Sequence, residues 1–96
     1  MLLFANGYYH SIAPEDVIRF FRNGNEYWME WKGKLGTWEI VNTPGKTFLE
    51  FRYNYAREDR YALTVIASQS GEITAFRLED ELGRSWDFQK ARTSNS

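Results

Sequence analysis

The sequence has 96 residues, of which 43% are hydrophobic, 18% aromatic and 26% charged. This length predicts a single domain, which we place at residues 1–92, followed by a frayed polar tail at 93–96. The formal net charge of −1 gives no overall attraction to nucleic acid or to an anionic membrane. The lack of cysteine excludes disulfides, thiolate nucleophiles and the cysteine-based zinc and iron–sulfur sites.

The N-terminus carries no recognisable targeting signal. Its apolar run at residues 1–5 is too short for a signal peptide, and no basic region precedes it. No apolar stretch approaches the ~20 residues that a membrane-spanning helix needs. Together with the absence of cysteine, these features predict a cytoplasmic protein without membrane contact.

The first expected elements are a short strand and a helix. Residues 1–5 are typical of a strand, and the Asn-Gly pair at 6–7 suits a two-residue turn, so residues 8–10 either return as a hairpin or form a loop. Pro14 suits the first turn of a helix, and the acidic residues at 15–16 would favour its N-terminal dipole. Apolar side chains at 17, 18, 20 and 21 follow helical spacing, and Asn23-Gly24 is a common helix end. The pattern predicts a helix over 14–23.

From residue 26 onward, apolar and polar residues alternate with the period of a strand. Short turns rich in glycine and polar residues interrupt the alternation. The pattern predicts six strands, at 26–32, 36–42, 47–55, 61–68, 72–79 and 84–90.

The predicted fold class is therefore α+β. A short strand or hairpin and the helix would pack on a curled antiparallel meander of about six strands, forming a half-open roll or a small barrel. The helix would contribute Val17 and either Phe20 or Phe21 to the core. The side chains expected to face the core from the strands are Trp38, Ile40, Leu49, Phe51, Tyr53, Leu63, Val65, Phe76, Leu78, Trp86 and Phe88.

No catalytic or metal-binding constellation is recognisable. The single histidine, His10, lies near Glu15 and Asp16, which could indicate a metal site or proton relay but is better explained by a strand end beside a helix start. The acidic run at 79–81 falls in a predicted turn. We expect a protein that is not an enzyme and that has no cofactor and no metal.

Three glutamates lie on neighbouring predicted strands. Glu30, Glu39 and Glu50 could form a carboxylate site, but like charges in register are unfavourable without cations such as Lys32 or Arg52. An exposed ladder of ion pairs is therefore the preferred interpretation, and a carboxylate-based enzyme is kept as a less favoured alternative.

Residues 46–53 alternate basic and aromatic side chains, as single-strand nucleic-acid binders do. The segment lacks the glycines of the RNP1 pattern and has Glu50 at its centre. Together with the slightly acidic net charge, these features make nucleic acid an unlikely partner.

Gly36-Thr37-Trp38 resembles the Gly-x-Trp motif that begins the first barrel strand of lipocalins and other calycins. The resemblance covers three residues. It implies a ligand-binding barrel in which a basic residue near the last strand, here Arg84, packs across the tryptophan. The chain departs from the family pattern because a strand-like segment precedes the motif and too few residues follow it for eight strands. An ordinary hairpin explains the same three residues.

Several apolar side chains interrupt the polar side of the predicted strands. Trp28, Phe48 and Ile66, with Arg52, would form an interaction face of the composition found at binding hot spots. The leading hypothesis is a non-enzymatic binding protein of the inhibitor, immunity or adaptor type, which acts on a protein partner or self-associates. The alternative is a small-ligand-binding barrel or roll whose pocket is lined by Trp31, Trp38, Tyr53 and Trp86.

Overall fold

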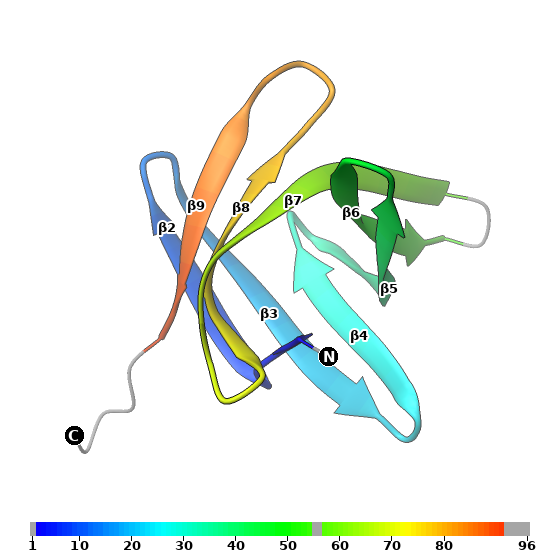
Figure 1. Ribbon diagram of the computed structural model, residues 1–96. Coiled ribbons are helices and arrows are strands. Elements are labelled where there is room, and N and C mark those ends of the chain that lie inside the picture. The colour runs from blue at the N-terminus through cyan, green and yellow to red at the C-terminus, as the bar shows by residue number, and fades with distance from the viewer. Residues whose placement is uncertain (1, 55–56, 92–96) are drawn as a thin grey trace.

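The computed structural model describes residues 2–54 and 57–91, and these residues form an all-β fold without a helix (Figure 1). None of the described residues therefore forms a helix long and apolar enough to cross a membrane. The strands are β1 (Leu3–Phe4), β2 (Gly7–Ile12), β3 (Glu15–Asn23), β4 (Glu26–Trp31), β5 (Lys34–Thr43), β6 (Lys46–Tyr53), β7 (Arg57–Gln69), β8 (Glu72–Glu79) and β9 (Ser85–Lys90).

Strands β2 to β9 form a closed antiparallel barrel of eight strands. Each strand pairs with the next along the chain, and β9 closes the barrel by pairing with both β2 and β8. The short strand β1 pairs in parallel with the start of β8. The barrel thus has the up-and-down order of a meander, and the N-terminal segment lies at its lower end (Figure 1).

The prediction of an α+β fold was wrong, because the predicted helix at 14–23 is strand β3. Ile18 and Phe20 point into the barrel, and Val17 and Arg19 point outward, so the period is two rather than 3.6. The β-branched and aromatic residues of this segment favour strands. The helix start and stop signals belong to two tight turns, and the Ser11 hydroxyl donates a 2.7 Å hydrogen bond to the Pro14 carbonyl oxygen across the first of them.

The possible N-terminal hairpin is also not formed. β2 pairs with β3 and β9, whereas β1 pairs with β8. Asn6-Gly7 is a bend between two strands with different partners, and Gly7 has a φ of 126°, which glycine tolerates.

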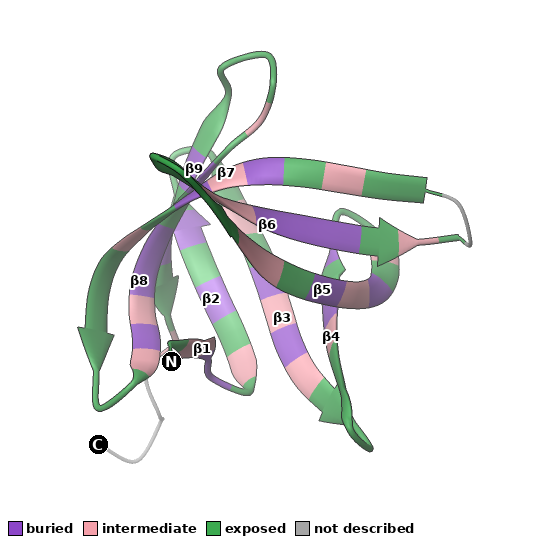
Figure 2. Cartoon of the chain, turned by 45° about the vertical axis from the view of Figure 1, so that its right-hand side comes forward, coloured by how far each residue is buried: buried purple, intermediate pink, exposed green. Residues whose placement is uncertain are grey.

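The six strands predicted after residue 26 are confirmed as β4 to β9, with ends that shift by a few residues. Residue 55, at the end of one predicted strand, and the predicted tail at 93–96 lie outside the described residues. All the side chains predicted to face inward from these strands are buried or half-buried, as the alternating colours along the strands show (Figure 2).

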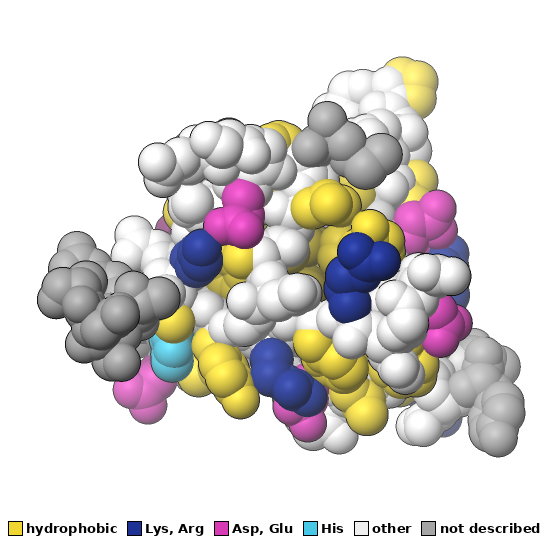
Figure 3. Space-filling view, turned by 90° about the horizontal axis from the view of Figure 1, so that it is seen from below, with side chains coloured by type: hydrophobic (Ala, Val, Ile, Leu, Met, Phe, Trp, Pro, Cys, Tyr) yellow, Lys and Arg dark blue, Asp and Glu magenta, His cyan; other side chains and the backbone are white. Residues whose placement is uncertain are grey.

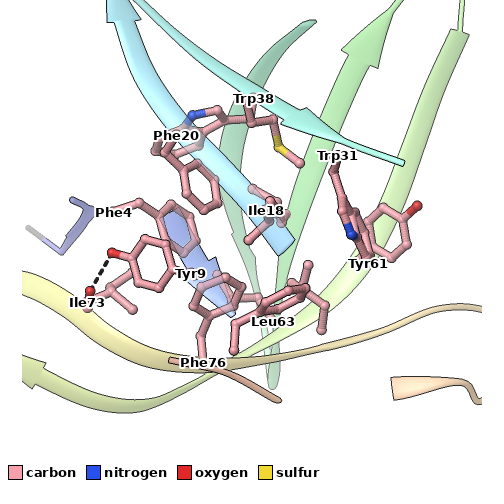
Figure 4. Close-up of a cluster of buried hydrophobic side chains, with 14 of the residues drawn as sticks. Phe4, Tyr9, Ile18, Phe20, Trp31, Trp38, Tyr61, Leu63, Ile73 and Phe76 are labelled. Atoms are coloured by element: carbon pink, nitrogen blue, oxygen red, sulfur yellow. Dashed lines mark hydrogen bonds between the residues drawn. The ribbon is translucent and has the colours of Figure 1, made fainter. Parts of the chain in front are cut away.

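The aromatic side chains fill the barrel in two adjoining groups (Figure 4). At the lower end, Phe4 stacks on Phe20 with 4.0 Å between ring centroids, and Tyr9 and Trp38 meet these rings edge-on. At the upper end, the Trp31 ring lies 5.0 Å from both Tyr61 and Trp86. A small domain obtains much of its buried area from such rings.

The Gly-x-Trp resemblance does not extend to the features that it implied. Three barrel strands precede Gly36, so the motif does not begin the first strand. Arg84 does not pack across Trp38, because it pairs with Asp80 at 2.6 Å near the other end of the barrel. Gly36 is required for another reason: a Cβ at this position would collide with the Arg52 carbonyl group, where β5 and β6 lie close together.

Candidate functional site

A cavity lies between the β5–β6 hairpin, strand β7 and the N-terminal segment. Its volume is about 970 Å³. Seen from below, hydrophobic side chains gather on this end of the molecule, with a few basic and acidic side chains among them (Figure 3). The cavity is lined by Leu2, Leu3, Tyr27, Trp38, Glu39, Ile40, Asn42, Gly45, Lys46, Thr47, Ala62, Leu63, Thr64, Val65, Ile73 and Glu79.

The cavity exists because the end of the β5–β6 hairpin leaves the barrel wall on both sides. The pairing of β4 with β5 runs only as far as Trp28 and Thr37, so the later residues of β5 pair with β6 alone. The pairing of β6 with β7 ends at Phe48 and Ala62. Beyond these points the hairpin and β7 diverge, and apolar side chains of both line the space between them.

Trp38 forms an aromatic wall of this cavity. The Trp38 ring packs against the rings of Phe4, Phe20 and Tyr27, with 5.1, 5.7 and 5.5 Å between ring centroids. These contacts fix its orientation. Trp38 is 9% exposed, and its indole N–H has no hydrogen-bond partner among the described residues. A buried donor without a partner costs free energy, so a ligand or water that reached it would gain a hydrogen bond.

The N-terminal segment forms the lower boundary of the cavity, and Tyr9 holds it in place. The Tyr9 hydroxyl accepts a 2.7 Å hydrogen bond from the Ala5 amide and donates a 2.6 Å hydrogen bond to the Ile73 carbonyl oxygen (Figure 4). Burial raises the pKa of Tyr9 to about 12, so the hydroxyl keeps its proton and remains a donor.

A smaller cavity of about 390 Å³ lies at the upper end and is mainly polar. Its centre is the Asp59 carboxylate, which accepts hydrogen bonds from the Tyr53 hydroxyl at 2.8 Å, Lys34 at 3.2 Å and the Tyr61 hydroxyl at 3.4 Å. Burial, and then the Asp59 charge, raise the pKa of Tyr61. Basic and acidic side chains alternate around this cavity, so it has no dominant charge to attract a ligand.

The predicted pocket residues are not brought together at one mouth. All four belong to the barrel interior, but Trp38 lines the lower cavity whereas Trp86 lines the upper one. Trp31 packs on Trp86, and Tyr53 belongs to the Asp59 network. Sequence alternation places these side chains inside the barrel but does not say at which end, because the end depends on strand register.

The predicted interaction face is divided by charged residues. Trp28 stacks with Phe21, with 6.4 Å between the ring centroids. Phe48 lies on β6, and the Arg60 guanidinium carbon lies 4.5 Å from the centroid of its ring. Arg52 lies on β6 in the ion-pair network described next. Ile66 is 53% exposed on the part of β7 that has left β6. The use of this face in binding stays a prediction.

The predicted exposed ladder of ion pairs is formed only in part, because it joins Glu39 and Glu50 but not Glu30, and Glu50 is buried. Glu50 is 7% exposed and accepts hydrogen bonds from Arg60 at 2.6 Å and Arg52 at 3.0 Å, and Arg52 also pairs with Glu39 at 3.1 Å. Glu30 is separate and pairs with Arg19. Within residues 2–54 and 57–91, no three His, Asp or Glu side chains gather closely enough to hold a metal ion.

Sequence reasoning missed the contributions of Leu3, Tyr27 and the β5–β6 turn to the lower cavity. No local signal identifies them, because they reach the cavity only through barrel closure. The length of β7, which extends from Arg57 to Gln69, was missed as well, because the predicted strand covered only residues 61–68.

Comparisons with models of protein families, with curated proteins and with solved structures found no match.

Proposed function

We propose that this barrel is a binding protein that holds a small, mainly apolar ligand in the lower cavity. The observation that carries the proposal is the 970 Å³ space with Trp38 as its wall. Ligand sites commonly measure about 300–1,000 Å³ and are lined by apolar and aromatic side chains with a few polar groups. Trp38, Ile40, Leu63 and Val65 supply the apolar surface, and Thr47 and Asn42 supply polar groups.

The proposal uses the barrel as a rigid frame. Aromatic contacts on three sides hold Trp38, and Tyr9 ties the lower boundary to β8, so the cavity walls are held before a ligand arrives. A preformed site does not have to be ordered on binding, which favours affinity. Binding without catalysis and a cytoplasmic setting both remain parts of the proposal.

Titration with the fluorescent apolar anion 1-anilinonaphthalene-8-sulfonate tests the proposal. We expect saturable enhancement of its fluorescence by the folded protein. The Val65→Phe variant should weaken binding at least about tenfold, because the larger ring occupies the cavity. Val17→Phe is the matched control, since Val17 is exposed on the outer side of β3 and the same change there leaves the cavity unaltered.

Near-ultraviolet circular dichroism of both variants shows whether the barrel remains packed. Equal binding by wild type, Val65→Phe and Val17→Phe would place the dye elsewhere and refute the proposed site.

A further inference from the structure

We propose that the ligand of the lower cavity is a short peptide in an extended conformation, whose main chain pairs with the open edge of β7. This inference rests on the proposed function and names the ligand class. It follows from the backbone groups that border the cavity as well as from the side chains that line it.

The open edge begins where β6 and β7 separate. Strand β7 pairs with β6 from Arg57 to Ala62, whereas its residues from Leu63 to Gln69 pair only with β8. Figure 1 shows β7 turning away from β6 and running down beside β8. Along this part of β7, alternate N–H and C=O groups point away from β8 and have no strand beside them among the described residues.

This edge coincides with the cavity. Leu63, Thr64 and Val65 belong to both, and the opposite wall is formed by Lys46 and Thr47 at the start of β6. A strand laid beside β7 here would direct alternate side chains toward the barrel interior, because side chains alternate between the two faces of a strand. Those side chains would enter the apolar space lined by Trp38 and Ile40.

The open main-chain groups of β7 favour a peptide rather than a hydrocarbon as the ligand. In the free protein, water can reach the open groups of this edge, since Thr64 is exposed and Val65 is half-exposed. A ligand that fills the cavity as far as β7 displaces this water and must replace its hydrogen bonds. An acyl chain cannot do so, whereas an added strand supplies donors and acceptors at matching intervals.

Two further features define the peptide. The pairing of β7 with β8 is irregular between Val65 and Ser68, and such a bulge bends the edge, so regular pairing extends over about three or four ligand residues. Three charged residues border the cavity: Glu39 is neutralised by its ion pair with Arg52, whereas Lys46 and Glu79 have opposite charges and no ion-pair partner among the described residues. These charges cancel, so the cavity favours a peptide without net charge.

The test uses fluorescein-labelled hexapeptides with Ser at alternate positions and Val, Leu, Ile or Phe at the others. For the tightest binder, two derivatives are made, one N-methylated at every apolar position and one at every Ser. N-methylation removes the N–H donors along one edge of the peptide and leaves the other edge intact. We expect one derivative to lose at least about tenfold in affinity and the other to stay within about twofold of the parent.

A second readout locates the contact. Amide hydrogen exchange of the protein should slow at Leu63 to Val65 when the parent peptide is bound, and β3 near Val17, which does not line the cavity, serves as an internal control. Equal effects of both methylation patterns, or no added protection at Leu63 to Val65, would overturn strand addition.

The outcomes separate this inference from the proposed function. If the anilinonaphthalene dye binds at Val65 but none of the peptides binds, the cavity is a ligand site and the peptide assignment is wrong. If neither dye nor peptide binds, both proposals are wrong.

Discussion

The Tyr9 hydroxyl donates a 2.6 Å hydrogen bond to the Ile73 carbonyl oxygen and so joins β2 to β8 at the lower end of the barrel. The Tyr9 hydroxyl oxygen also accepts a 2.7 Å hydrogen bond from the Ala5 amide. One side chain thereby holds the N-terminal segment against the strand with which β1 pairs. Both residues are fully buried, so no water competes for these hydrogen bonds.

The change Tyr9→Phe should lower the free energy of unfolding by about 1–3 kcal/mol, because it leaves the buried Ala5 amide and Ile73 carbonyl without this partner. Urea unfolding followed by tryptophan fluorescence measures the effect. Tyr8→Phe is the control, since Tyr8 is 52% exposed on the outer side of the same strand. Equal stability of Tyr9→Phe and wild type would show that the N-terminal segment does not depend on Tyr9.

Stability should fall at alkaline pH in a defined window. The pKa of Tyr9 rises from 10.0 to about 12 because burial penalises the phenolate. Between about pH 10 and about pH 12 the unfolded chain loses this proton while the folded protein retains it, so the free energy of unfolding decreases by up to about 1.4 kcal/mol per pH unit. Below pH 10 this contribution is complete and constant.

Burial raises the pKa of Tyr61 as well, so Tyr61 contributes in the same direction. Urea unfolding at a series of alkaline pH values measures the slope, which should be smaller in Tyr9→Phe than in wild type. The same slope in both proteins would contradict the assignment to Tyr9.

Gly36→Ala should destabilise the barrel by about 1–3 kcal/mol or more, because the added methyl group meets the Arg52 carbonyl group rather than a movable side chain. Thermal unfolding compares it with Thr37→Ala, which alters the adjacent residue and should cost about 1 kcal/mol or less. An unchanged melting temperature for Gly36→Ala would mean that β5 and β6 can separate at this point without cost.

The predicted interaction face has its own test. If Trp28 and Phe48 bind a second copy, wild type should show a concentration-dependent dimer in native mass spectrometry, and Trp28→Ala and Phe48→Ala should each shift it toward monomer by about tenfold or more. Leu82→Ala is the control, because Leu82 is exposed at the other end of the barrel. Association that neither substitution changes would remove this face as the contact.

The sequence predicts most of the strands but not their closure. Alternation from Tyr27 to Phe88 identifies β4 to β9 and their inward side chains, because a strand with one buried face must repeat every two residues. Residues 15–23 were misassigned to a helix, because four apolar residues within five positions are compatible with the helical period of 3.6 as well as with the strand period of two. The β3 assignment depends on pairing with β2 and β4, which no local pattern reveals.

The site was predictable only in part. The prediction that aromatic side chains line the interior follows from alternation, and Trp38 does line the larger cavity. The cavity itself arises where β6 stops pairing with β7 at Ala62, which is a matter of register between distant strands. Local sequence fixes neither this register nor the position of Leu3 beside β8.

Titration with 1-anilinonaphthalene-8-sulfonate, followed by ¹H–¹⁵N nuclear magnetic resonance, tests the ligand-binding proposal most directly. The spectrum contains four tryptophan indole N–H signals, which single Trp→Phe variants assign. Trp31 and Trp38 are both buried and both lack a partner for this group among the described residues, so they form a matched pair at opposite ends of the barrel. Binding in the lower cavity predicts a saturable shift of the Trp38 signal and little change in the Trp31 and Trp86 signals. A Trp38 signal that stays fixed at saturating dye, or a shift confined to Trp31 and Trp86, would contradict the proposed site.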